Sequence, residues 1–568
     1  MSGPGDRAPK DSRPMEPTQS FGAEGHGDDP NNVDLGRSLH PGSESSARAQ
    51  STPAREPGDL EGGPELDGER RAGAGRHRAA IRAVRLEESD EVVVPKKPSK
   101  TWVTPVESVE GRTEAEGKSA ARNALPAQDG TGALTFLQRI GQRARRNKEE
   151  KFTTLLSHLK VPLLREAFMS LRKTAASGID GVTWHEYAER LDERLLDLQD
   201  RVHRGSYHPQ PVRRVYFAKS DGRLRPLGIP ALEDKIVQQA ARMVLEPIYE
   251  AQFLGFSYGF RPGRSPHDAL DALAEVIHRK VSWVLDADIR SFFDTIDHGW
   301  MQQFLEHRIG DRRMVRLLMK WMRAGVMEEG ELRGVDRGTP QGGIISPLLA
   351  NIYLHYALDL WVQSWRKKRA RGELYFVRYA DDFVMAFRYE EDVRAMHAAL
   401  SARLAKFGLE LHPDKTRVIR FGRYAREEAA RRGRKPETFD FLGFTHISGT
   451  NRAGRFQLKR RTSRKKRGAK LAELRKQMRR RMHDPPASQW RWLCAVLKGH
   501  YRYYAVPTNY RALAGFCRAV RNAWYRALQR RSQRARWTVA KLQRFEQRYP
   551  LPAPKILHPW PERRFAGP

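Results

Sequence analysis

Cysteine is nearly absent from this sequence, and long apolar runs are absent altogether. Cys494 and Cys517 are the only cysteines in 568 residues, which argues against a disulfide framework and against a zinc site built from paired cysteines. No apolar run reaches the length of a membrane span, and no apolar signal segment follows the first residues. We therefore expect a cytoplasmic protein with no membrane partner.

Acidic residues are scarce toward the C-terminus. Residues 456–568 hold 30 Lys or Arg against 4 Asp or Glu, a net charge of +26, whereas residues 1–130 carry −5 and residues 131–455 carry +14. The whole chain has a net charge of +35 and a pI of about 10.4. This balance predicts a polyanionic partner, with nucleic acid the first choice and a membrane surface the competing interpretation. Nucleic acid should bind mainly to the C-terminal region.

Aromatic residues are scarce at the other end of the chain. Phe21 and Trp102 are the only ones in residues 1–130, where Gly, Pro, Ser and Glu are frequent. Such a segment cannot bury enough apolar surface to offset its chain entropy, so we expect a disordered extension. Order should begin near Leu134. The sequence predicts an α+β region over residues 131–455 and a basic helical region over residues 456–568.

The stretch Tyr375–Phe387 places two adjacent carboxylates between runs of β-branched and aromatic residues. These runs favour strands, so we expect a β-hairpin with Asp381 and Asp382 at its turn. Adjacent carboxylates repel each other, and a divalent cation such as Mg²⁺ or Mn²⁺ would neutralise them with hard oxygen ligands. For an isolated Asp-Asp pair, a solvated turn would be the better interpretation. A third carboxylate shifts the balance toward a metal site.

That third carboxylate belongs to the stretch Val281–Asp294. A hydrophobic strand ends there in Asp286 and Asp288, whose side chains point to the same face because strand residues alternate. One of the two is expected to bind metal and the other to be structural. Phe293 follows five residues after Asp288, on the next turn.

Three further segments carry functional signals. Strand-like residues on both sides of Asp221-Gly222 predict a hairpin. The nearby cations Lys219, Arg223 and Arg225 suit a nucleotide triphosphate. The competing interpretation is that these basic residues only keep the hairpin soluble. The glycine-rich run Thr339–Gly343 precedes a helix and allows the backbone to approach a ligand closely. The run Phe439–Phe444 predicts a short strand and a turn.

In this order, the motifs resemble the bacterial group II intron reverse transcriptases and maturases, over roughly residues 134–568. Tyr379-Ala380-Asp381-Asp382 resembles the catalytic tetrad of that family, and Asp288 is similar to its first catalytic aspartate. Thr339–Gly343 resembles the loop beneath the templating base pair. Phe441–Phe444 resembles the primer-grip turn. The fold implied is a right-hand polymerase, with fingers and an antiparallel palm sheet in residues 131–455 and an α-helical thumb and maturase domain in residues 456–568.

The resemblance also implies a role for each matching residue. The catalytic residues are Asp288, Asp381 and Asp382, and Ile289 joins them at the metal site. The residues implied to contact the deoxynucleotide are Lys219, Arg225, Ile289, Phe293, Gln341 and Lys415, with Phe293 blocking a ribose 2′-hydroxyl. The residues implied to contact template or primer are Gly342, Gly343, Phe441, Leu442 and Gly443. The residues proposed to bind RNA are Arg464, Lys465, Lys466 and Arg467.

The implied reaction is RNA-directed DNA synthesis. A primer 3′-hydroxyl attacks the α-phosphate of a deoxynucleotide, and two Mg²⁺ ions about 4 Å apart stabilise the attacking and leaving oxygens, with Mn²⁺ as a substitute. The implied partners are group II intron RNA, an RNA or DNA template with its primer, deoxynucleotides and target DNA. In a bacterium, association with the nucleoid is compatible with this reading.

One departure from the family concerns the endonuclease that some of its members carry at the C-terminus. No paired-cysteine motif is present, so we expect no such domain, and DNA insertion would need another source of a primer end. Two alternatives remain open. One is a splicing factor on a polymerase scaffold that has lost catalysis, and the other is a reverse transcriptase of a retron, a diversity-generating element or a phage-defence system.

Overall fold

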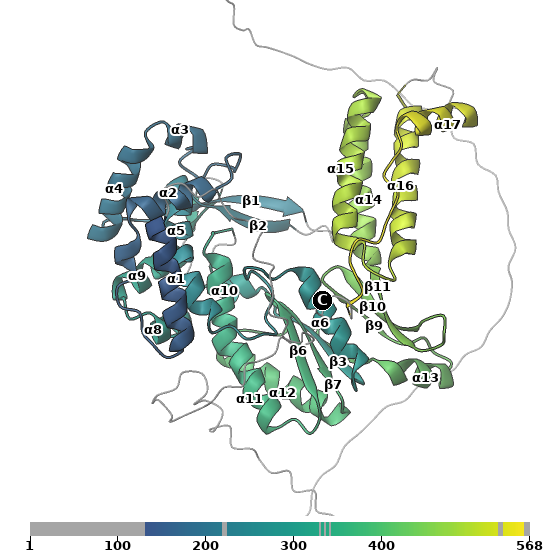
Figure 1. Ribbon diagram of the computed structural model, residues 1–568, viewed down its shortest axis with the longest axis horizontal. Coiled ribbons are helices and arrows are strands. Elements are labelled where there is room, and N and C mark those ends of the chain that lie inside the picture. The colour runs from purple at the N-terminus through teal and green to yellow at the C-terminus, as the bar shows by residue number, and fades with distance from the viewer. Residues whose placement is uncertain are drawn as a thin grey trace, which may run out of the picture. The chain divides into compact units, whose positions relative to one another are not determined.

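The computed structural model describes residues 131–218, 224–328, 331–333, 337–339, 342–531 and 538–561 (Figure 1). The disorder expected for residues 1–130 concerns a segment outside the described residues. Within the described part of the chain, no helix is long and apolar enough to cross a membrane.

Helices dominate the first described region. They are α1 (Thr131–Arg146), the short 3₁₀ turn η2 (Leu156–His158), α2 (Val161–Ser170), α3 (Trp184–Ala188), α4 (Leu191–Arg204) and α5 (Leu232–Glu250). Helices α1 and α2 pack on α5. Helix α5 has buried apolar residues on every turn, so it forms the centre of this region.

A four-stranded sheet with the order β2-β1-β4-β5 lies beside these helices. Its strands are β1 (Val212–Ala218), β2 (Leu224–Ile229), β4 (Val326–Glu328) and β5 (Glu331–Arg333). Strands β1 and β2 pair antiparallel, which confirms the strand pair predicted around Asp221-Gly222. The turn itself lies outside the described residues.

The central sheet has the order β6-β7-β3-β8, and all its neighbouring strands are antiparallel. The strands are β3 (Trp283–Asp288), β6 (Leu374–Tyr379), β7 (Asp382–Phe387) and β8 (Arg417–Arg420). Helix α6 (Pro266–His278) packs against β6, and helix α12 (Glu390–Lys406) packs against β3 and β7. The predicted β-hairpin at Asp381-Asp382 is therefore present.

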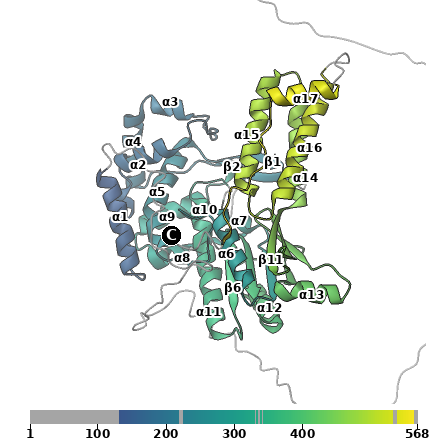
Figure 2. The same cartoon turned by 45° about the vertical axis from the view of Figure 1, so that its right-hand side comes forward.

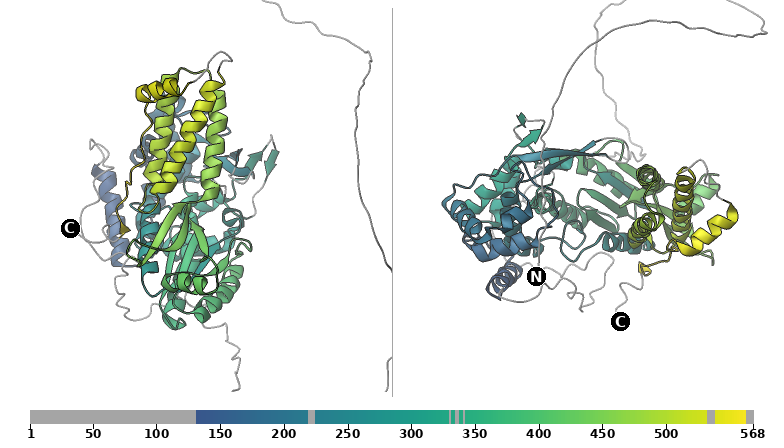
Figure 3. Two further views of the ribbon diagram at one scale, coloured as in Figure 1. Left: turned by 90° about the vertical axis from the view of Figure 1, so that its right-hand side faces the viewer. Right: turned by 90° about the horizontal axis from the view of Figure 1, so that it is seen from above.

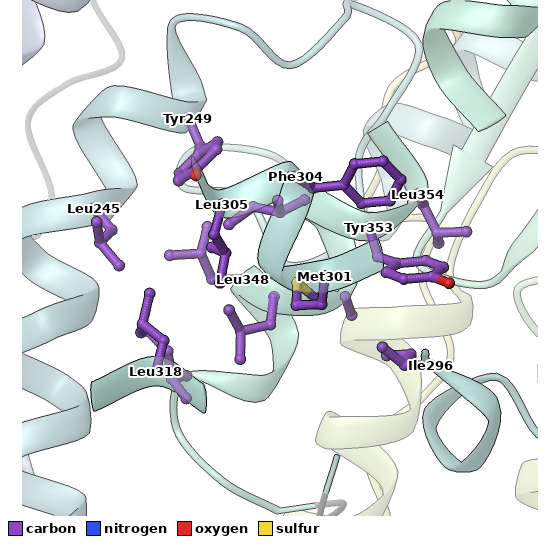
Figure 4. Close-up of a cluster of buried hydrophobic side chains, with 14 of the residues drawn as sticks. Leu245, Tyr249, Ile296, Met301, Phe304, Leu305, Leu318, Leu348, Tyr353 and Leu354 are labelled. Carbon is purple, nitrogen blue, oxygen red and sulfur yellow. The ribbon is translucent and has the colours of Figure 1, made fainter. Parts of the chain in front are cut away.

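The main hydrophobic core forms where several helices converge (Figure 4). These are α5, α8 (His298–Arg308), α9 (Arg312–Met322) and α10 (Ser346–Leu354). Figure 4 shows Tyr249 of α5, Phe304 of α8 and Tyr353 of α10 within this cluster. Helix α10 continues through a π-helical turn, η3 (His355–Asp359), into α11 (Leu360–Lys368).

A third sheet, of three strands, follows with the order β11-β10-β9. Its strands are β9 (Thr438–Phe441), β10 (Phe444–Thr450) and β11 (Phe456–Thr462), and α13 (Arg423–Arg431) packs on β10. The predicted turn at Leu442-Gly443 is confirmed.

The expectation that the chain is helical from Phe456 onward is wrong for its first seven residues, which form β11. Leu458, Arg460 and Thr462 are buried, whereas the residues between them are more exposed. This alternation with a period of two is typical of a strand. The high density of basic residues obscured it in the sequence, because Arg460 is a cation that points inward.

The remaining chain forms the helical region, which we define as α14 to α17. Its helices are α14 (Arg464–Arg480), α15 (Pro486–Tyr504), α16 (Tyr510–Gln529) and α17 (Val539–Arg548). In Figures 1 to 3, α14, α15 and α16 run side by side and α17 crosses near one end. Leu493, Phe516 and Trp524 belong to their shared core.

Candidate active site

The central sheet brings together carboxylates that are almost one hundred positions apart in the sequence. Asp288 ends β3 and lies opposite Asp382, the first residue of β7. Asp382 also pairs with Tyr379 of β6, so Ala380 and Asp381 form the turn between those two strands. The sheet register therefore gathers the three predicted aspartates at one edge.

The electrostatics of this edge reflect crowding of like charges. Burial raises the pKa of Asp382 well above its ordinary value, and the negative charges of Asp286, Asp288 and Asp381 raise that pKa further. Burial also raises the pKa of Asp286 to about 6, an effect that the neighbouring Arg417 opposes. Removing the repulsion requires protons or a cation.

The two aspartates of β3 have different surroundings. Asp286 is buried, and its Oδ2 lies 3.5 Å from Nη2 of Arg417 on β8. Asp288 forms an ion pair with Nζ of Lys415 and keeps 21% of its side chain exposed. The sequence left open which of the two would be structural, and these contacts favour Asp286 for that role.

The segment around Lys415 runs along the end of β3. Main-chain hydrogen bonds join His412 N to Asp288 O at 2.8 Å and Arg290 N to Glu410 O at 2.8 Å, and Ile289 forms an isolated bridge with Leu411. Lys415 is thereby held beside Asp288, and its contact with a triphosphate stays a prediction. The side chain of Ile289 is buried, so only its main chain could serve a ligand.

These residues fit a hard divalent cation by their chemistry. The donors at the edge are carboxylate oxygens, the ligands that Mg²⁺ and Mn²⁺ prefer, and they repel one another without a compensating charge. Among the described residues, no three His, Cys, Asp or Glu side chains are already grouped as a metal site. The ammonium group of Lys415 instead provides the positive charge next to Asp288.

The turn between β6 and β7 is held by Arg378, a residue to which the sequence analysis assigned no role. Its guanidinium binds both carboxylate oxygens of Asp359, the side chain of Asn351 and the carbonyl of Ala380. A single arginine within an otherwise apolar strand was the available signal. Its side-chain partners Asp359 and Asn351 could not be read from the sequence, because they lie on helical segments upstream.

Phe293 lies in the short helix α7 (Phe292–Thr295), which begins after Ser291 in a left-handed conformation (φ 47°). Its ring is half-buried and contacts the ring of Phe292 edge-on at 5.4 Å. Its carbonyl accepts a hydrogen bond from Thr339 N at 2.8 Å. Phe293 therefore lies between the end of β3 and the glycine-rich loop.

The described part of the glycine-rich loop is packed closely. Gly342 has a φ of 121°, and a β-carbon there would collide with the carbonyl of Gly228 on β2. Oε1 of Gln238, on α5, accepts a hydrogen bond from Ile344 N at 2.8 Å and lies 3.1 Å from where a β-carbon on Gly343 would be. Only glycine fits at position 342, and Gln238 is a supporting residue that sequence reasoning missed.

Some predicted nucleotide contacts cannot be located. Lys219 and Gln341 lie outside the described residues, and only the main chain of Arg225 is described, in β2 opposite Phe217. The predictions for these three residues therefore remain predictions.

The predicted primer-grip turn lies between β9 and β10, and β9 contacts β7 of the central sheet. Leu442 and Gly443 both have positive φ, 48° and 80°. The hydroxyl of Tyr503, on α15, donates to the carbonyl of Leu442 at 2.8 Å, and Ser463 N donates to the carbonyl of Gly443 at 3.0 Å. The turn is thus tied to the start of α14 and to the end of α15.

The predicted RNA-binding run forms the first turn of α14. Arg464, Lys465 and Lys466 are exposed and Arg467 is half-buried. The first turn contains no acidic residue. Because the N-terminus of a helix carries a partial positive charge, four cations there destabilise the helix unless an anion binds nearby.

Comparison with known proteins connects this geometry to a family. Residues 217–446 match the family model described as "Reverse transcriptase (RNA-dependent DNA polymerase)". The chain is 38% identical to protein YkfC of Escherichia coli K12 over 283 residues, which cover 44% of this chain and 74% of YkfC.

Two further relatives have names that refer to introns. The group II intron-encoded protein LtrA of Lactococcus lactis is 38% identical over 237 residues, which cover 41% of this chain and 39% of LtrA. The nuclear intron maturase 3 of Arabidopsis thaliana is 29% identical over 181 residues, 30% of this chain and 25% of that protein. The chain belongs to the reverse transcriptase (RNA-dependent DNA polymerase) family.

Proposed function

We propose that this protein copies RNA into DNA at the edge formed by Asp288, Asp381 and Asp382. The register of the central sheet carries this proposal, since it pairs Asp288 with Asp382 and leaves Asp381 in the adjoining turn. The three carboxylates, with the main chain of Ile289, would hold two Mg²⁺ ions, for which Mn²⁺ can substitute. When bound, these ions stabilise the attacking and leaving oxygens of nucleotidyl transfer.

Other residues of the chain would bind the substrates. Lys415 is beside Asp288 and would neutralise the triphosphate of the incoming deoxynucleotide, together with Lys219 and Arg225. Phe293 would pack on the sugar and exclude a 2′-hydroxyl. Gln341 would contact the nucleotide.

The template and primer would be held by two turns. The backbone at Gly342 and Gly343 is free of side chains and would pass close beneath the templating base pair. The turn Phe441-Leu442-Gly443 would hold the primer end. In this arrangement residues 131–455 form the fingers and palm, and β11 with the helical region forms the thumb and maturase domain.

We further propose that the protein binds its group II intron RNA, assists its splicing and copies it during insertion into target DNA. The charge of +26 on residues 456–568 and the exposed run at the start of α14 support this proposal. So does a pocket of about 430 Å³ between α14 and α16, lined by Arg475, Arg479, Arg526 and Arg530. Phosphate groups are the ligands that such arginines prefer. We expect these events in the cytoplasm, with association to the nucleoid.

Primer extension on an RNA template tests the polymerase proposal. Asp288→Ala and Asp381→Ala should each lower metal-dependent extension to background, because each removes a charged ligand from a site with few others. Asp414→Asn, which changes a carboxylate close in sequence to Lys415 but outside the three, should leave extension near the wild-type rate. Near-wild-type extension by either alanine variant would refute the assignment.

A further inference from the structure

Arg378 is a charged residue at a fully buried position of the catalytic hairpin. Its side chain is completely buried in β6, between apolar neighbours. Its main chain pairs with Phe383 of β7 on one side. On the other side its N–H donates to Phe256 O at 2.9 Å and its carbonyl accepts from Tyr258 N at 2.8 Å. The backbone of Arg378 is therefore fixed on both edges.

The guanidinium of Arg378 makes four hydrogen bonds. Nε and Nη2 donate to the two carboxylate oxygens of Asp359, at 2.7 and 2.5 Å. Nη1 donates to Oδ1 of Asn351 at 3.1 Å and to the carbonyl of Ala380 at 3.0 Å. Asp359 is also fully buried, so the planar fork of the arginine and the carboxylate fix each other's orientation.

The bond to Ala380 acts on a strained part of the hairpin. Ala380 has a φ of 58°, a left-handed conformation that costs energy for a residue with a β-carbon. Its carbonyl belongs to the peptide group that leads into Asp381. A donor fixed on this oxygen therefore sets the orientation of that peptide, and with it the direction in which Asp381 leaves the turn.

A second brace closes the same turn. The backbone of Gly259 lies so close to Ala380 that a β-carbon on Gly259 would collide with the Ala380 amide. Nδ2 of Asn351 donates to Gly259 O at 2.7 Å, while its Oδ1 accepts from Arg378. Asn351 therefore connects the arginine with the segment that backs the turn.

The partner of the arginine comes from an unusual piece of helix. Asp359 is the last residue of the π-helical turn η3, between α10 and α11. π-Helical turns are rare in proteins, and those that do occur are often found at functional sites. The insertion of this turn and the buried charge on Asp359 are both features that packing alone does not require.

We propose that Arg378, held by Asp359 and Asn351, is a positioning residue that aims Asp381 and Asp382 at the metal ions. The residue touches neither metal nor nucleotide and acts through the carbonyl of Ala380. The inference rests on the proposed function of the three aspartates. It predicts that removing the hydrogen bonds of the Arg378 guanidinium lowers the affinity for metal and the turnover rate, with little effect on the affinity for nucleotide.

A purely structural ion pair is the competing explanation, and the chain contains a matched control for it. Nη1 of Arg460, on β11, lies 2.6 Å from Oδ1 of Asp271 on α6, and both side chains are buried. This pair also joins a strand to a helix across a long stretch of sequence. The two residues belong to β11 and α6, not to the hairpin formed by β6 and β7, so loss of the pair should affect stability alone.

The test compares Arg378→Lys with Arg460→Lys in the full-length protein. Lysine keeps the charge but lacks the planar fork that reaches Asp359, Asn351 and Ala380 together. Mn²⁺ binding to the free protein is measured by electron paramagnetic resonance. Primer extension gives kcat, the KM for deoxynucleotide and the Mg²⁺ concentration for half-maximal rate, and thermal unfolding gives Tm.

Arg378→Lys should weaken Mn²⁺ binding and lower kcat by about 10- to 100-fold, the range typical for partners of metal ligands, with KM nearly unchanged. Arg460→Lys should lower Tm without changing either quantity. If Arg378→Lys does not fold, Asn351→Ala gives the same test, because it leaves the charge pair intact and removes the brace on Gly259.

The inference is overturned if Arg378→Lys, or Asn351→Ala in its place, lowers only Tm, as Arg460→Lys does. It is also overturned if Arg460→Lys weakens Mn²⁺ binding as much. Asp381→Ala in the same assays separates this result from a failure of the proposed function. Full extension by Asp381→Ala would refute the active site itself, whatever Arg378 does.

Discussion

The central sheet and the helical region use arginine in opposite ways. In the sheet, Arg378 is completely buried and makes four hydrogen bonds to fixed partners. In the helical region, Arg464 is exposed on the first turn of α14, and the four arginines around the α14–α16 pocket form no ion pair with a described residue. The same side chain thus fixes geometry in one place and remains available to a polyanion in the other.

This difference reflects two physical requirements. Chemistry needs groups held in position, and a buried, bidentate arginine provides that because its loss leaves an uncompensated charge, at a cost of about 3–5 kcal/mol. Binding a long polyanion needs many accessible cations, each of which releases counterions when it meets a phosphate. We therefore expect synthesis and RNA binding to fail separately when either region is changed.

The largest expected effect in the helical region concerns the salt dependence of RNA binding. Replacing Arg464, Lys465, Lys466 and Arg467 with alanine should weaken intron RNA binding by roughly 10²-fold or more and lower the slope of log affinity against log salt by about 3. Filter binding over a salt series measures both. Alanines at Arg431, Arg432, Arg434 and Lys435, an exposed run that ends α13 and follows it, remove the same charge and should change the slope less.

A smaller effect is expected on the choice between ribonucleotide and deoxynucleotide, which we assign to Phe293. Phe293→Ala should raise ribonucleotide incorporation relative to deoxynucleotide by about 10- to 200-fold, the range for a single missing steric contact. Competition between the two nucleotides in one extension assay measures it. Phe292→Leu, at the buried neighbour, should lower stability without this change in sugar preference. An unchanged ratio for Phe293→Ala would assign that ring to the core.

Buried histidines predict how stability depends on pH. Burial lowers the pKa of His355 and of His446 to about 3, below their ordinary value of 6.5. The unfolded chain therefore binds more protons as the pH falls below 6.5, and stability decreases by up to about 1.4 kcal/mol per pH unit for each histidine. Denaturant unfolding of His446→Leu between pH 7 and pH 5 should show a shallower loss than the wild type. An identical slope would contradict the pKa of His446.

The smallest effect is expected from the segment with the fewest core-forming residues. Removing residues 1–130 should leave extension and RNA binding unchanged, because this segment has only two aromatic residues and a net charge of −5. Purification and both assays on the shortened protein test this. Loss of folded protein, or of either activity, would show that the segment has a role.

The parts of this molecule that the sequence predicted are local. The hairpin at Asp381-Asp382 and the turn at Leu442-Gly443 follow from residues a few positions apart. Their signals are the alternation of apolar residues and the residues typical of turns, and each signal is contained in one short window.

The parts that it did not predict depend on distant residues. From the sequence, Arg378 is a single charged residue within a strand, and only the fold shows that Asp359 and Asn351 are its partners. Arg460 reads as part of a basic helix, although its partner Asp271 is 189 positions away and draws it into the core. In both cases an ion pair with a residue distant in sequence buries a charge that the neighbouring sequence alone would place at the surface. The contact of Gln238 with the glycine-rich loop is of the same kind.

The most direct test of the account compares two variants in two assays. Asp381→Ala and the fourfold alanine variant at residues 464–467 are each measured in intron splicing and in extension of a short, pre-annealed primer at high enzyme concentration. The account predicts crossed losses: Asp381→Ala keeps splicing assistance and loses synthesis, whereas the fourfold variant loses splicing assistance and keeps most synthesis. If both variants fail in the same assays to the same extent, the central sheet and the helical region do not divide chemistry from RNA binding.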